Sequence, residues 1–190
     1  MSENQSQLHD TPARYGTVSR FFHWTMAAIL AWQFATALSH LLLEDTAIEG
    51  FLWSTHKAVG LLLIVLVVLR GLWSLRNRGH RPPSLSPMAN LGHLALYLLM
   101  IVVPLIGLLR QYGSGRAFEP FGIPLMPGFE GDRIEWMMAP GFLHSWLGWL
   151  LLAMVVGHIA MVFIHRRRPR DEDVLARMLG DRQSGPSRVS

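Results

Sequence analysis

Four long runs of apolar residues, separated by short polar segments, dominate the 190-residue chain. They cover residues 21–43, 51–75, 88–109 and 140–165. Each run reaches or exceeds the ~20 residues that an α-helix needs to cross ~30 Å of hydrocarbon. Inside a bilayer every backbone N–H and C=O must be paired within its own segment, so such runs form helices. The pattern therefore predicts an all-α fold, an integral membrane bundle of four transmembrane helices.

The polar segments alternate in charge, and this alternation predicts the orientation of the bundle. The segment after the first run carries three acids and no basic residue before Lys57, whereas the segment after the second run carries three Arg and no acid. Basic residues also flank the outer ends of the bundle sequence, at Arg14, Arg20 and 166–170. Because cytoplasmic loops are enriched in Lys and Arg, both termini are expected in the cytoplasm.

Composition supports a membrane protein and excludes several kinds of site. Charged residues make up 16% of the chain, against roughly 25% in soluble domains. The net charge of +4 is explained by the loop alternation, so nucleic-acid binding is not expected. The chain has no Cys, which excludes disulfides, iron–sulfur clusters, thiolate metal sites and covalent haem attachment. The first 14 residues lack the apolar stretch of a cleavable signal peptide, so the first run is expected to direct insertion.

The chain is expected to form one membrane domain over residues 15–170. A cytoplasmic tail, residues 1–14, precedes it, and a second tail, residues 171–190, follows with a short surface helix over 171–179. The segment 111–139 is rich in Gly, Pro and aromatic residues and is expected to fold over the outer mouth of the bundle. Pro104 is expected to kink the third helix.

Histidines are the strongest candidates for chemistry, because an ionisable residue inside a membrane helix marks a function by default. His144 and His158 lie 14 residues apart in the last run. At ~100° and ~1.5 Å per residue, both side chains leave one face of the helix about 21 Å apart. One therefore lies near the outer surface and the other near the inner surface, as two stacked cofactors would require.

The topology supplies a partner for each of these imidazoles at the same depth. His56, at the start of the second run, is level with His144, and His23, at the start of the first run, is level with His158. Two His from facing helices can hold haem iron axially. His93 lies at the same inner depth as His23, and depth alone does not choose between them. Hydrogen-bonded packing histidines, or a zinc site, are the alternatives, although the carboxylates that usually join His at zinc are absent from the runs.

Several motifs, taken in order, carry a family resemblance. They are Ser19-Arg20-Phe21-Phe22-His23-Trp24, His56 with Gly60, Leu91-Gly92-His93-Leu94 with Tyr97, the His144/His158 pair, and Asp173-Val174-Leu175-Ala176-Arg177-Met178-Leu179. Together they resemble the bacterial cytochrome b561 family over residues 15–179. The resemblance implies two b-type haems, with iron held by His23 and His158 on the inner side and by His56 and His144 on the outer side. The choice of His23 over His93 rests on this resemblance.

The resemblance also implies a function, namely electron transfer in the bacterial inner membrane with ubiquinone as acceptor. Some members of the family are superoxide oxidases, so superoxide or another donor is expected to be oxidised at the outer face. The implied partners are lipid, quinone and a redox partner protein. One alternative is a cytochrome b anchor subunit of a larger dehydrogenase or hydrogenase complex. The other is a haem-free membrane metal carrier or scaffold.

Charged residues near the histidines have two readings each. Lys57, together with Arg110, Arg116 and Arg133, could form a positive funnel for an anion such as superoxide, or could belong to a solvated loop. Arg70 is expected to extend to the inner headgroups, with pairing to a haem propionate as the alternative.

Small and aromatic residues in the runs also have two readings. Four glycines could let a porphyrin approach the helix backbones or could serve ordinary helix packing; they are Gly60, Gly107, Gly148 and Gly157. Four tryptophans near the span ends are expected to be interfacial anchors; they are Trp24, Trp53, Trp73 and Trp136. Trp146 and Trp149, which follow His144, could pack on the outer porphyrin.

Overall fold

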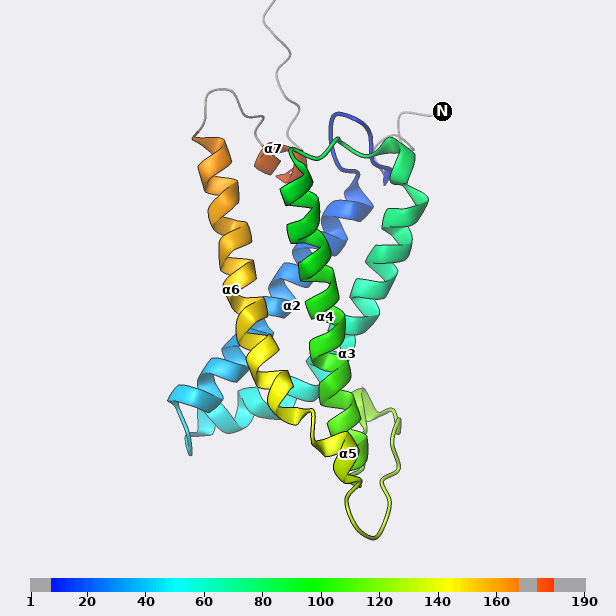
Figure 1. Ribbon diagram of the computed structural model, residues 1–190, viewed down its shortest axis with the longest axis vertical. Helices are drawn as coiled ribbons and strands as arrows, with labels where there is room; N and C mark the ends of the chain where they lie inside the picture. The colour runs from blue at the N-terminus through cyan, green and yellow to red at the C-terminus, as the bar shows by residue number, and fades with distance from the viewer. Residues whose placement is uncertain (1–7, 168–173, 180–190) are drawn as a thin grey trace, which may run out of the picture.

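The fold is a bundle of four long helices, seen in a computed structural model that describes residues 8–167 and 174–179. The helices are α2 (Thr17–Leu42), α3 (Ala47–Arg76), α4 (Pro87–Gly113) and α6 (Gly141–Arg166) (Figure 1). All four are long and apolar enough to cross a membrane. Within the described ranges there is no β-strand, only one isolated bridge between Phe118 and Met126. The prediction of an all-α, four-helix membrane protein is confirmed.

Short elements mark the two ends of the bundle. At one end, here called the terminal end, lie the segment that precedes α2, the 3₁₀ turn η1 (Arg78–His80) and α7 (Val174–Leu179). At the other end, here called the loop end, lie η2 (Pro120–Gly122), α5 (Glu135–Met138) and the loop around them (Figure 1). Residues 1–7 and 180–190, which belong to the two predicted tails, lie outside the described residues, as do 168–173.

Capping residues fix where two of the long helices begin. The Thr46 hydroxyl accepts a hydrogen bond from the Glu49 N–H at the start of α3. The Ser86 hydroxyl accepts from the Ala89 N–H at the start of α4, where Pro87 is the first helical residue. Both arrangements satisfy backbone donors that the first helical turn cannot pair by itself.

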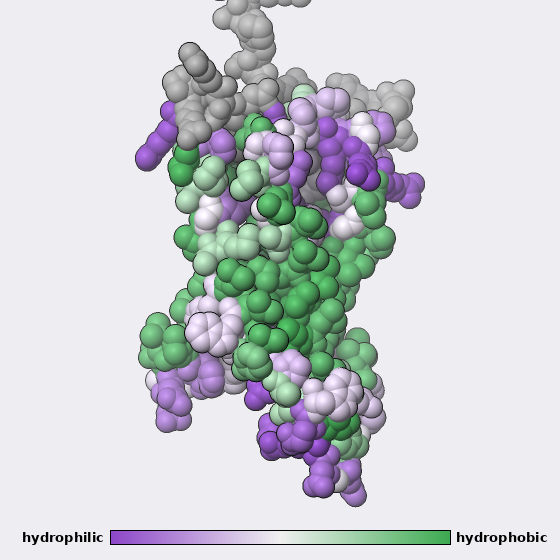
Figure 2. All heavy atoms as spheres, in the orientation of Figure 1, coloured by the Kyte–Doolittle hydropathy of each residue, from purple (hydrophilic) through white to green (hydrophobic). Residues whose placement is uncertain are grey.

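Three pairs of helices make most of the contacts between the long helices. Helix α2 packs on α3, α3 on α4, and α4 on α6. The buried apolar core comprises Met26, Leu30, Leu63, Val67, Leu96, Met100 and Leu151. Leu151 is the only buried residue that α6 contributes among those described. Elsewhere large apolar side chains remain exposed and form the green band between two polar ends in Figure 2, as contact with lipid requires.

The segment before α2 is anchored on the terminal end of α3. Asp10 is buried, and its carboxylate accepts a hydrogen bond from the Gly16 N–H at 2.9 Å and pairs with Arg81 Nε at 3.2 Å. The His9 ring stacks on Trp73, with the ring centroids 5.2 Å apart. This part of the chain is thus held to the bundle by specific polar contacts.

Helix α7 is also attached to the terminal end. Arg20 Nη1 donates a hydrogen bond to the Leu179 carbonyl at 2.9 Å, and Trp24 Nε1 donates to the Met178 carbonyl at 3.2 Å. Both donors belong to the first turns of α2. The short helix therefore covers the place where α2 enters the bundle.

The Asp10–Arg81 pair gives a test of this anchoring. Asp10→Ala leaves the Arg81 guanidinium and the Gly16 N–H without their partner, at a cost of about 1–3 kcal/mol. The midpoint of thermal unfolding in detergent should fall accordingly. Asp132→Ala, which removes an exposed acid at the loop end, is the matched control and should leave the midpoint unchanged. Equal midpoints for both variants would contradict an anchoring role for Asp10.

Candidate functional site

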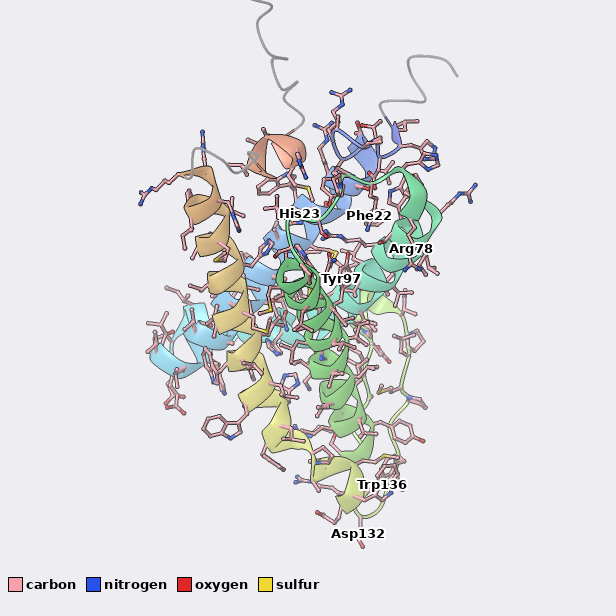
Figure 3. All side chains as sticks on the ribbon, turned by 45° about the horizontal axis from the view of Figure 1, so that its top comes forward. Phe22, His23, Arg78, Tyr97, Asp132 and Trp136 are labelled. Carbon is pink, nitrogen blue, oxygen red and sulfur yellow. The ribbon has the colours of Figure 1, made fainter. Side chains whose placement is uncertain are left out.

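Imidazoles from separate helices meet in two places, one near each end of the bundle. Near the loop end, His56 of α3 and His144 of α6 have ring centroids 6.0 Å apart. Near the terminal end, where Figure 3 labels His23, that residue of α2 and His158 of α6 have ring centroids 6.4 Å apart. The structure thus brings together both predicted pairs. His93 of α4 lies 5.4 Å from His158 by the same measure.

These separations can be compared with the requirement of a shared metal ion. With metal–nitrogen bonds of about 2.0–2.1 Å, two imidazoles on opposite sides of one metal have ring centroids about 6 Å apart. Both predicted pairs fit this separation, and the His93/His158 pair is shorter. His23 is also half-buried, as are its partner and the loop-end pair, whereas His93 is exposed.

The described part of the chain holds no group of three or more His, Asp or Glu side chains placed to bind a metal ion. A zinc site usually takes three or four protein ligands. Two opposed imidazoles suit instead a metal whose remaining ligands come from a macrocycle. The donor set therefore fits haem iron.

Hydrogen bonding fixes the tautomer of His144. Its Nδ1 lies 2.8 Å from the Val103 carbonyl of α4, which can only accept, so Nδ1 carries the proton. The lone pair of this imidazole then lies on Nε2, the usual arrangement for a metal-binding His held by a backbone carbonyl.

His56 is contacted by two polar residues of α2. Its Nδ1 lies 2.6 Å from Thr36 Oγ1, and the Thr36 hydroxyl donates to the Gln33 carbonyl at 2.7 Å. Gln33 Nε2 donates to the His56 carbonyl at 3.0 Å and lies 3.1 Å from His56 Nδ1 and 3.2 Å from His56 Nε2. Polar groups of α2 therefore hold the His56 ring in place.

Gly107 is required for the position of His144. A Cβ atom at this position would lie 3.0 Å from His144 Cε1 and 3.1 Å from its Nδ1, closer than side chains normally approach. The absence of a side chain lets the imidazole lie against α4 and reach the Val103 carbonyl. Gly148 and Gly157 differ, because a Cβ at either would meet nothing within 4 Å.

The sequence pattern did not single out Gln33 or Thr36, and it marked Trp53 only as an interfacial anchor. Trp53 lies between His40 and His56, with ring centroids 3.9 Å from the first and 4.7 Å from the second. Trp146 is 72% exposed, so it is Trp53 that packs beside the loop-end pair. Gln33 and Thr36 could have been noticed as polar residues three apart within an apolar run, since such residues are costly in a membrane helix.

Arg70 extends into the bundle, so the expectation that it reaches the headgroups is wrong. Its Nη1 lies 3.3 Å from His23 Nδ1 and 3.9 Å from Met26 Sδ, and its guanidinium carbon lies 5.5 Å from the Tyr97 ring centroid. Two of these contacts come from α2 and one from α4. His23 Nδ1 thus lies beside a guanidinium, whereas His144 Nδ1 lies beside a backbone carbonyl.

Lys57 connects the loop end to the His56 region. Its Nζ donates to Gln111 Oε1 at 2.7 Å, and Gln111 Nε2 donates to the carbonyls of Arg116 and Ala117. Arg110 and Arg116 lie close enough to act on Lys57 electrostatically. A group of cations therefore lies on the loop side of His56.

Comparison with known proteins decides the family. The family model described as prokaryotic cytochrome b561 matches residues 14–181, which include the four spans and both imidazole pairs. The chain belongs to the prokaryotic cytochrome b561 family. Cytochrome b561 homolog 2 of Escherichia coli (strain K12) is 36% identical over 183 residues, 92% of this chain and 96% of that protein. Probable superoxide oxidase CybB of Yersinia pestis is 25% identical over 174 residues, 87% of this chain and 96% of that protein.

Membership confirms the resemblance seen in the motifs and establishes the general role. This cytochrome b561 is a multi-pass inner-membrane protein that transfers electrons, and its family implies b-type haem. A haem-free carrier or scaffold, one of the alternatives raised by the sequence, does not agree with that family.

Proposed function

We propose that this cytochrome b561 holds two b-type haems, one near each end of the bundle. His56 and His144 would hold the loop-end haem, and His23 and His158 the terminal-end haem. The observation that carries the proposal is the meeting of two imidazole pairs from different helices, with centroid separations of 6.0 and 6.4 Å. Bound haem would supply one-electron transfer at each pair.

Neighbouring residues position the imidazoles of the loop-end pair for metal binding. The Val103 carbonyl accepts the Nδ1 proton of His144, so its Nε2 lone pair is available, and Thr36 Oγ1 lies 2.6 Å from Nδ1 of His56. Partners of this kind orient metal-binding imidazoles and increase their basicity. Trp53 packs against His56 and limits the motion of its ring.

At the terminal end, the proposed partner of His158 is His23, and His93 is not a haem ligand. Its shorter distance to His158 and its exposure both favour His23 as the second ligand. The family resemblance of the His23 motif favours the same assignment.

For the reaction, we propose that superoxide is oxidised at the loop end and that ubiquinone is the electron acceptor. Two superoxide ions each lose one electron and become O₂, while ubiquinone takes up two electrons and two protons and becomes ubiquinol. The basic residues near the chain termini would place the terminal end in the cytoplasm and the loop end outside. The Yersinia pestis relative named as a probable superoxide oxidase supports this substrate.

Lys57 and its arginine neighbours would draw the substrate to the loop end. Superoxide is an anion, and a cluster of cations raises its local concentration and its association rate. Lys57 directly follows His56 in α3, so the attracted anion would arrive next to the loop-end pair.

The first prediction concerns the terminal-end ligands. His158→Ala should remove one haem and spare the other, because the loop-end pair is unaffected. A pyridine haemochromogen assay against protein concentration measures the loss. His93→Ala is the control and should retain both haems. Unchanged haem content in His158→Ala would refute the ligand assignment, and a lost haem in His93→Ala would show that the partner of His158 is His93.

The second prediction concerns Gly107. Gly107→Val places a branched side chain where even a Cβ lies 3.0 Å from the His144 ring, so it should displace that imidazole and lower haem content by about one equivalent. The remaining haem should be the one that His158→Ala removes. Gly92→Val, in the same helix but with open space at its Cβ, should keep both haems. A full haem complement in Gly107→Val would argue against His144 as a ligand.

The third prediction concerns the cations at the loop end. Lys57→Gln should lower the rate of superoxide-dependent ubiquinone reduction by about 2- to 10-fold at low ionic strength, and the rate should depend less on salt. The exposed Arg78→Gln, at the terminal end, removes the same charge and should have neither effect. Identical salt dependence in Lys57→Gln and the unaltered protein would exclude steering by Lys57.

A further inference from the structure

Arg70 is a cation inside a membrane-spanning helix, and no residue that the structure describes forms a salt bridge with it. It lies six residues before the end of α3, about 9 Å along the helix axis from Arg76. Within the described residues, the ion pairs join His40 to Glu49 and Arg81 to Asp10, and neither involves Arg70. Asp10 is already engaged by Arg81 and by the Gly16 N–H.

The direction of the Arg70 side chain makes this unusual. Its contacts are an imidazole nitrogen, a thioether sulfur and an aromatic ring, all on neighbouring helices. None of these carries a negative charge. A charge that is removed from water is costly unless a counter-charge accompanies it, and membrane arginines are therefore found paired or turned to the headgroups. Arg70 is turned inward, so it needs a counter-charge, which no salt bridge among the described residues provides.

A carboxylate of the terminal-end cofactor meets this requirement. Arg70 Nη1 lies 3.3 Å from His23 Nδ1, so the guanidinium is level with a proposed axial ligand of that haem. A b-type haem carries two propionate carboxylates, and Arg binds carboxylates through two parallel N–H···O hydrogen bonds. We propose that Arg70 pairs with a propionate of the terminal-end haem and raises the reduction potential of that haem. This inference rests on the proposed function, because it assumes a haem between His23 and His158.

The effect on potential follows from charge. Oxidised haem carries one positive charge more than reduced haem, so a nearby cation destabilises the oxidised form and raises the reduction potential. In the low-dielectric interior this effect is larger than at a solvated surface.

The test is a potentiometric titration of the purified haem-loaded protein, followed in the visible spectrum. Arg70→Gln should shift one haem to lower potential, and this should be the haem that His158→Ala removes. Arg70→Lys, which keeps the charge, should stay closer to the unaltered protein. Arg76→Gln removes the exposed arginine of the same helix and should shift neither haem.

Each outcome decides the question. Loss of the terminal-end haem from Arg70→Gln, with retention in Arg70→Lys, would also support the pairing. Unchanged potentials in Arg70→Gln would overturn it and leave a lipid phosphate as the partner of Arg70. Equal shifts in the Gln and Lys variants, loss of the haem from both, or a shift in the loop-end haem would overturn it as well. If the unaltered protein bound no haem, the proposed function itself would fail, which is a distinct result.

Discussion

An imidazole can bind a metal only through a nitrogen whose lone pair is free, and the hydrogen bond at the other nitrogen holds the ring in position. At the loop end, the Val103 carbonyl accepts the Nδ1 proton of His144, and Thr36 Oγ1 lies 2.6 Å from Nδ1 of His56. Both partners belong to helices other than those that carry the imidazoles. The pair is therefore positioned by α2 and α4 as much as by α3 and α6, and Gly107 makes the closest of these approaches sterically feasible.

The groups that contact the terminal-end pair differ from those at the loop end. At the terminal end, His23 Nδ1 lies 3.3 Å from the Arg70 guanidinium. The segment before α2 and helix α7 cover this end through contacts with Asp10, Arg20 and Trp24. The loop end instead presents Lys57 and Gln111, which tie α3 to the segment after α4. Two similar imidazole pairs thus lie in unlike environments.

Much of this arrangement could be predicted from the sequence. The four spans follow from the length of the apolar runs, and the depth of each His follows from its position along a helix of known rise. That is why His56 could be matched with His144, and His23 with His158, before any coordinates were considered. Depth does not give the rotation of a helix about its axis, so the sequence alone left His23 and His93 equivalent.

The remaining features could not be predicted, for physical reasons. Lipid and the bundle interior both select apolar side chains, so the composition of α3 does not show which of its faces is inside. The direction of Arg70, which belongs to α3, depended on this unknown, and the backbone carbonyl of Val103 has no sequence signature. Trp53 is a tryptophan near the end of a span, which is typical of an interfacial anchor. In the structure its ring instead lies between the rings of His40 and His56.

The central claim is that the four half-buried imidazoles hold two haems at opposite ends of one bundle. The oxidised-minus-reduced visible spectrum of the purified protein, combined with the haem-to-protein ratio, tests it most directly. Two b-type haems per chain, with the spectrum of six-coordinate low-spin iron, are expected. A ratio of one, or the absence of a Soret band in protein produced with ample haem, would contradict it.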